Sequence, residues 1–176
     1  MRSLFEYLGL RPAGPQSSDT DSASIAAIGK ALDALGPEQA RHLAAFAYLL
    51  GRVANADLDI SDDETRAMQT IVRESSGLPQ EQADLAVAIA QSQNRGVGGT
   101  EDFKVARVFK KISTRQQRQE LLHCLFAVAA ADGEISGEEE EQVRQIADEL
   151  GLTHREFAAI RSTFNDQRAV MRRLQS

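Results

Sequence analysis

The sequence contains no tryptophan, and aromatic residues make up only 5% of its 176 positions. With so few rings, we expect an aliphatic core and no aromatic platform for stacking sugars. The single cysteine, Cys124, excludes an internal disulfide and a cysteine-rich zinc site. One thiol suits a reducing compartment, so we expect a cytoplasmic protein.

Long apolar runs are missing as well. The longest, residues 43–50 and 124–131, are far shorter than the roughly 20 residues that cross a bilayer. The net charge is −6, whereas a general nucleic-acid binder is usually basic. The composition therefore disfavours a transmembrane protein and a nucleic-acid binder.

What the sequence does contain is helical periodicity. Apolar residues recur three or four positions apart, as in Ile25, Ile28 and Leu32, and no stretch alternates as a strand would. We expect a loose segment at 11–21 and helices at about 3–9, 23–35, 38–56, 62–76, 80–93, 101–112, 115–131, 137–150 and 154–164 or beyond.

Helix ends are marked by local signals. A capping box places Ser or Thr three residues before Glu or Gln, so that each side chain bonds the other's backbone N–H. The sequence has four, at Ser61/Glu64, Thr114/Gln117, Ser136/Glu139 and Thr153/Glu156. Gly151 is predicted to close the helix that carries Leu150.

Two segments, 50–71 and 125–146, repeat each other without gaps. Each has an apolar helix, a short acidic loop and a second amphipathic helix. We expect one all-α domain at 23–176, a compact bundle of about seven to nine helices, with the repeats at about 38–93 and 101–164 related by a pseudo-two-fold axis. A short N-terminal segment and linker, residues 1–22, precede it.

The signature Asp-x-[Asp/Glu]-Ile-Ser-x-x-Glu, present twice behind a helix of small residues, resembles the TerB family of tellurite resistance proteins. It is also similar to the wider superfamily that includes the N-terminal domain of the DjlA co-chaperones. The resemblance covers roughly residues 37–164, and the first copy departs from the pattern at Leu58, where glycine is common. It implies a compact helical fold, no enzymatic activity and a divalent-metal site in the acidic loops.

Carboxylate oxygens in both loops are the candidate metal ligands, and they suit Ca²⁺ or Mg²⁺. The predicted ligands are Asp57, Asp59, Glu64, Asp132, Glu134 and Glu139. Neither loop is a standard EF-hand, because Met68 and Val143 stand where a bidentate glutamate is needed. Alternatively, these acids only cap helices and complement the helix dipole.

Two functional hypotheses follow. The first is a non-enzymatic domain that senses or buffers a divalent cation in the response to tellurite or metal stress and couples it to a protein partner. The second is an interaction module whose acidic loops only cap helices. Its candidate surfaces are residues 1–10, the acidic run Glu138–Glu141, and six basic residues: Lys104, Arg107, Lys110, Lys111, Arg115 and Arg118.

Other features have simpler interpretations. Phe103, Phe109 and Phe164 fit core positions, and Cys124 falls on an apolar helix face as a buried thiol. Residues 1–10 form a short amphipathic stretch that could pack on its own domain, dock on a partner or a second copy, or touch a membrane surface weakly. No constellation of a nucleophile and a base is evident.

Overall fold

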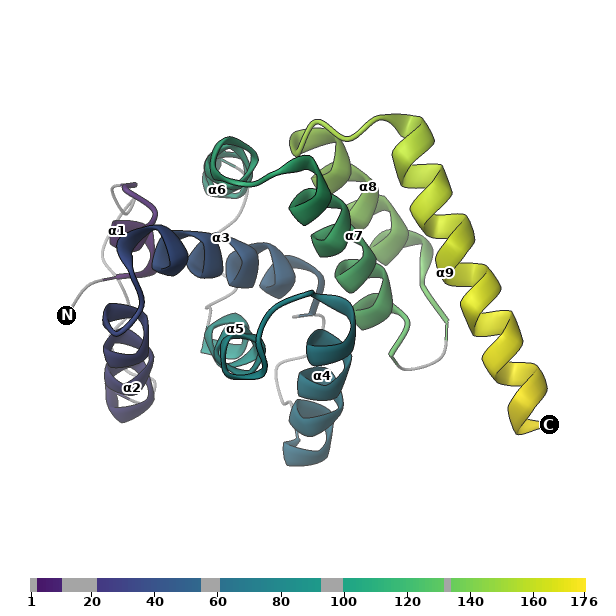
Figure 1. Ribbon diagram of the computed structural model, residues 1–176, viewed down its shortest axis with the longest axis horizontal. Coiled ribbons are helices and arrows are strands. Elements are labelled where there is room, and N and C mark those ends of the chain that lie inside the picture. Colours follow the sequence, from purple (N-terminus) through teal and green to yellow (C-terminus); the bar gives the residue numbers. More distant parts are fainter. Residues whose placement is uncertain (1–2, 11–21, 55–60, 93–99, 132–133) are drawn as a thin grey trace.

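The computed structural model describes residues 3–10, 22–54, 61–92, 100–131 and 134–176. These residues form nine helices and no strand, which confirms the all-α prediction (Figure 1). The helices are α1 Leu4–Tyr7, α2 Ser22–Asp33, α3 Pro37–Ala54, α4 Asp62–Ser75, α5 Gln80–Ser92, α6 Thr100–Ile112, α7 Arg115–Ala129, α8 Gly137–Glu149 and α9 His154–Gln175.

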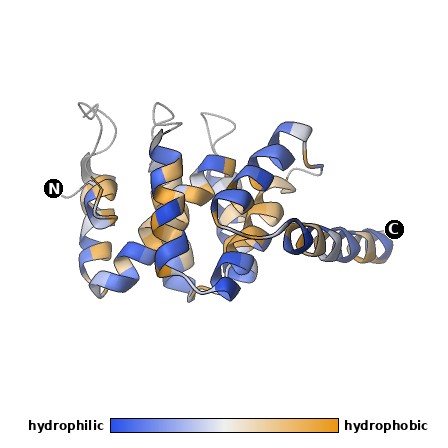
Figure 2. Cartoon of the chain, turned by 90° about the horizontal axis from the view of Figure 1, so that it is seen from above, coloured by the Kyte–Doolittle hydropathy of each residue, from blue (hydrophilic) through white to orange (hydrophobic). Residues whose placement is uncertain are grey.

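Helix α3 lies at the centre of the bundle because it is apolar nearly all the way round. Every residue from Leu43 to Leu50 is buried. Helices α1, α2, α5, α6, α7 and α8 all pack against it. Figure 2 shows that hydrophobic residues lie mostly between the helices and hydrophilic residues mostly on the outside.

Helix α7 is the second buried helix, with Leu121, Leu125 and Phe126 fully enclosed. It contacts α3, α4, α8 and α9. Helix α4 of the first repeat thus packs on α7 of the second, and α8 of the second packs on α3 of the first. The two repeats share one core, while their pseudo-two-fold relationship stays a prediction.

Local signals place the helix ends within two residues of most predicted bounds. Three predicted capping boxes are confirmed, at Thr114/Gln117, Ser136/Glu139 and Thr153/Glu156. The Glu64 side chain of the fourth lies outside the described part of the chain. An unpredicted capping box, Ser3/Glu6, starts α1. Gly151 has φ +72°, as a glycine that closes a helix often does.

The N-terminal segment packs on its own domain, one of the alternatives that the sequence left open. The Phe5 ring lies edge-on to Tyr48 of α3, with ring centroids 5.8 Å apart. Leu8 is buried, and the Tyr7 hydroxyl donates a 2.8 Å hydrogen bond to Asp33 of α2. These contacts hold α1 beside α2 and α3.

The core assignment of Phe103 is wrong. Phe109 and Phe164 are buried as predicted, but Phe103 is 50% exposed. The buried face of α6 carries Val105 and Phe109. Phe103 precedes Val105 by two residues, which is a rotation of about 200° around the helix, so its ring emerges on the opposite side.

Helix α9 continues beyond residue 164 to Gln175, as the sequence allowed, and it extends past the rest of the molecule (Figure 1). Phe157 and Phe164 are buried, whereas Val170, Met171 and Leu174 are exposed. Across the described ranges, no helix is both long enough and apolar enough to cross a membrane.

Candidate functional site

The acidic loops are only partly within the described structure. Asp57, Asp59 and Asp132 lie outside it. Glu64 lies in the first turn of α4, but its side chain is not among those described. Of the six predicted ligands, the structure therefore describes only the side chains of Glu134 and Glu139. The six-residue metal site stays a prediction.

Glu139 completes the capping box at the start of α8. Its Oε2 accepts a 2.8 Å hydrogen bond from the Ser136 backbone N–H, and the Ser136 hydroxyl accepts one from the Glu139 N–H at 3.1 Å. Its Oε1 has no hydrogen-bond partner among the described residues. The side chain can thus cap the helix and still offer one oxygen to a cation.

Negative charge is concentrated around the start of α8. Arg161 pairs with Glu140 at 3.1 Å, and Arg144 pairs with Glu141 at 2.6 Å. The hydrogen bond from Arg144 lowers the pKa of Glu141. Glu134 and Glu138 are exposed, and the described residues provide no ion pair for either. Of these four acids, Glu140 and Glu141 are neutralised by arginines, whereas Glu134 and Glu138 are not.

The described side chains do not by themselves assemble a metal centre. No cluster of three or more His, Cys, Asp or Glu residues with a suitable arrangement occurs among them. A cation would have to use the loop carboxylates that lie outside the described ranges, together with Glu134 and Glu139.

Two of the six clustered basic residues have structural roles. The Arg115 guanidinium pairs with Glu156 at 2.5 Å and lowers the pKa of Glu156 to about 2. Arg118 Nη1 donates a 2.9 Å hydrogen bond to the Leu150 carbonyl at the end of α8. A cation at a helix C-terminus is favourable because carbonyl oxygens point outward there.

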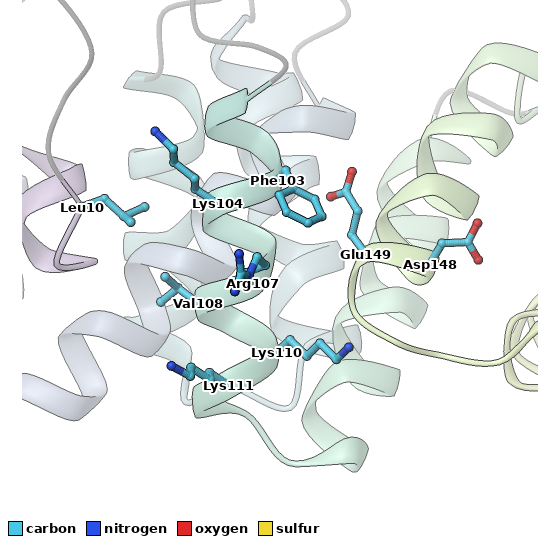
Figure 3. Close-up of a pocket in the computed structure, with 9 residues that line it drawn as sticks. All are labelled: Leu10, Phe103, Lys104, Arg107, Val108, Lys110, Lys111, Asp148 and Glu149. Carbon is cyan, nitrogen blue, oxygen red and sulfur yellow. The ribbon is translucent and has the colours of Figure 1, made fainter.

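The other four basic residues line a hollow of about 690 Å³ along α6, which we call the α6 groove (Figure 3). Its lining consists of Leu10, Phe103, Lys104, Arg107, Val108, Lys110, Lys111, Asp148 and Glu149. The Arg107 guanidinium carbon lies 5.8 Å from the centre of the exposed Phe103 ring. Lys104 pairs with Glu101 at 3.2 Å. The described residues give Arg107, Lys110 and Lys111 no carboxylate partner.

A buried ion-pair cluster lies behind the groove. Arg52 of α3, only 6% exposed at its side chain, pairs with Glu149 at 2.7 Å and with Asp102 at 3.6 Å. The Tyr48 hydroxyl donates a 2.8 Å hydrogen bond to Asp102. Burial, and next that hydrogen bond, raise the pKa of Tyr48. Because Arg52 already neutralises Glu149, this groove carboxylate does little to offset the lysines.

Sequence reasoning missed both Arg52 and the exposure of Phe103. The signal for Arg52 was present, since an arginine between Leu50 and Val53 interrupts an apolar helix and a buried arginine needs an acidic partner. The expected burial of Cys124 is confirmed. The thiol is fully enclosed, and burial raises its pKa to about 11, which keeps it protonated and unreactive.

The sequence was compared with known protein families, curated proteins and solved structures. Residues 42–162 match the protein family described as "Tellurite resistance protein TerB". No curated protein and no solved structure matches the chain. The matched residues run from α3 into α9 and include both acidic loops and the whole α6 groove except Leu10. More than half of the sequence fits the family, and the chain therefore belongs to the TerB family.

Proposed function

We propose that the chain is a cytoplasmic, non-enzymatic TerB domain that binds a divalent cation at its acidic loops. It responds to the metal or tellurite stress for which the family is named, and it transmits the bound state to a protein partner. The observation that supports this proposal best is the uncompensated charge beside α8. Glu134 lacks an ion pair among the described residues, and Glu139 keeps one carboxylate oxygen unused there.

The donor set determines which cation is expected. Carboxylate oxygens, without histidine or cysteine, suit the hard cations Ca²⁺ and Mg²⁺. The ligands are Asp57, Asp59, Glu64, Asp132, Glu134 and Glu139. Bound water completes the coordination, because neither loop supplies the bidentate glutamate of an EF-hand.

The test is thermal unfolding of the full chain, first in chelator and then with graded Ca²⁺, Mg²⁺ or Mn²⁺. A ligand at about 100 times its Kd stabilises the folded state by about 2.7 kcal/mol. In a chain of this size the melting temperature then rises by about 5–10 °C. We expect a saturable rise with one cation that is lost in Asp57→Ala/Asp132→Ala.

A matched control separates binding from general charge screening. Glu38 and Glu81 are exposed acids in the first turns of α3 and α5. Glu38→Ala/Glu81→Ala therefore changes the net charge equally, and it should keep the cation response. A response that both double variants share, or that follows ionic strength alone, would overturn the ligand assignment.

The alternative function is an interaction module that needs no cation. The complete capping box at Ser136/Glu139 favours it, because that geometry explains these two residues without a metal. In this case no cation shifts the melting temperature beyond screening, and a partner binds equally in chelator and in Ca²⁺.

A further inference from the structure

The lining of the α6 groove includes none of the six predicted metal ligands, and the groove has its own chemistry. Phe103, Arg107 and Lys111 are four residues apart, so they follow one face of α6. The opposite face, with Val105, Ala106 and Phe109, is fully buried in the core. The core holds the helix in place while its outer face offers one aromatic ring and a row of cations.

We infer that the α6 groove is a docking surface for an acidic, amphipathic segment of a partner protein. Carboxylates of the segment pair with Arg107, Lys110 and Lys111, and an apolar side chain lies against Phe103. This inference does not depend on cation binding, because none of the six predicted metal ligands lines the groove.

Charge complementarity is the first argument. Within the described structure Arg107, Lys110 and Lys111 have no acidic partner. Lys110 instead runs alongside the end of α8, with its Nζ 2.8 Å from where a side chain would begin at Gly151. A chain of net charge −6 thus carries a local concentration of unpaired positive charge. Such a patch attracts acidic segments and accelerates their association.

The apolar lining is the second argument. Phe103 is 50% exposed and has Arg107 at its ring face, an arrangement that offers a flat apolar surface beside a charge. Leu10 and Val108 add aliphatic surface at the other edge of the helix (Figure 3). Aromatic residues and arginine are enriched at the energetic centres of protein interfaces.

The acidic residues of the lining favour a peptide over a polyanion. Asp148 and Glu149 stand at the α8 side of the groove (Figure 3). Asp148, which has no ion pair among the described residues, would repel the continuous phosphates of a nucleic acid, and the overall negative charge would oppose an anionic membrane. A peptide can place carboxylates against α6 and neutral or basic groups against α8.

The test selects a binding sequence without assuming one. The full chain, kept in chelator, is panned against a phage library of random dodecamer peptides. Enriched peptides are then synthesised with a fluorescein label, and their Kd values are measured by anisotropy. We expect enriched sequences to combine several Asp or Glu with an aromatic or aliphatic residue, and to bind more weakly as salt rises.

Matched variants locate the binding. Arg107→Gln/Lys111→Gln removes two charges from the groove, while Arg155→Gln/Arg172→Gln removes two exposed charges from α9. All four positions are exposed and helical, so circular dichroism should show unchanged folding. The groove variant should weaken binding at least about tenfold, whereas the control should change it less than about twofold. Phe103→Ala should weaken binding without altering the salt dependence.

Three results would overturn the inference. One is enrichment of peptides with no excess of acidic residues. Another is equal affinity of the two double variants for the enriched peptides. The third is groove-dependent binding to a single-stranded oligonucleotide or to phosphatidylserine vesicles with no peptide binding. Because chelator is present throughout, loss of cation binding affects none of these measurements.

Discussion

Arg52 on α3 and Glu149, the last residue of α8, form a 2.7 Å ion pair with 6% and 11% of their side chains exposed. The arginine also lies 3.6 Å from Asp102 at the start of α6. Three helices that are distant in sequence therefore meet at one guanidinium group. The pair fixes how α6 and α8 lie against the central helix, and with them the two sides of the α6 groove.

Removing Arg52 should destabilise the fold strongly. Arg52→Met leaves the Glu149 and Asp102 carboxylates partly buried without their cation, and breaking a buried pair in this way costs about 3–5 kcal/mol. Urea unfolding followed by circular dichroism measures the loss. In contrast, Arg73→Met breaks the more exposed pair with Asp84, and it should cost no more than about 1 kcal/mol. An equal loss of unfolding free energy in both variants would show that the buried cluster stabilises the fold no more than an exposed pair.

Ser136 and Glu139 allow the capping and ligand roles to be separated. Ser136→Ala removes the hydroxyl that caps α8 and should lower the free energy of unfolding by about 1 kcal/mol. It should leave the cation Kd unchanged. Glu139→Gln keeps an oxygen that can accept from the Ser136 N–H but removes the charge, so it should weaken cation binding with little loss of stability.

Both variants are measured by urea unfolding and by calorimetric titration with Ca²⁺ or Mg²⁺. The proposal predicts opposite outcomes for the two substitutions. If Glu139→Gln does not alter the cation Kd, then Glu139 caps α8 and is not a metal ligand.

Gly151 should not tolerate alanine. Its φ of +72° is strained for any residue with a side chain, and an added Cβ would lie 2.7 Å from Cε of Lys110. Gly151→Ala should therefore lower the free energy of unfolding by about 1–2 kcal/mol. At Gly137, in the first turn of α8, an added Cβ would meet no atom of the described residues within 4 Å, its own helix backbone and chain neighbours aside. Gly137→Ala should be neutral or stabilising by up to about 1 kcal/mol, and a similar loss in both variants would contradict the argument.

Glu156 should make stability depend on acid pH. Its hydrogen bonds from Arg115, and next from the Thr153 backbone, lower its pKa from the ordinary 4.5 to about 2. A carboxyl with a lowered pKa stabilises the fold above its unfolded-state pKa and loses that contribution as the pH falls through the folded-state value. The melting-temperature difference between wild type and Glu156→Gln should be constant above about pH 5.5, shrink between about pH 4.5 and 2, and vanish below.

Arg115→Gln provides the companion measurement for Glu156. It removes the main cause of the lowered pKa, so its acid dependence should shift towards the ordinary range of a glutamate. An unchanged acid profile in Arg115→Gln would show that the pair with Glu156 does not form in solution.

Features that depend on a few neighbouring residues were predictable from the sequence. The capping boxes at Thr114, Ser136 and Thr153 link residues three apart, and the conformation of Gly151 depends on its own missing side chain. Helix ends follow from such interactions whatever the rest of the chain does. This explains why the order and bounds of the helices agree so closely with the prediction.

Features that depend on tertiary packing were not predictable. Arg52 and Glu149 are 97 residues apart, and Arg118 and the Leu150 carbonyl are 32 apart. The sequence showed a span of basic residues from Lys104 to Arg118, but only folding determines that Arg118 closes a helix while Arg107 stays available. Which side chains line the groove depends on how α6 packs against the core. The exposure of Phe103 depends on the same packing.

The exposed end of α9 has a consequence for how the helix melts. Beyond Phe164 every residue except Arg168 is exposed, so intrahelical hydrogen bonds provide most of the stability there. A free helix of about ten residues is marginal in water, because starting the first turn is costly. Here the docked half, held by Phe157 and Phe164, supplies that first turn, and the remainder only extends it. Its amide protons should exchange with solvent progressively faster towards Gln175, in a gradient of fraying that begins well below the temperature at which the core unfolds.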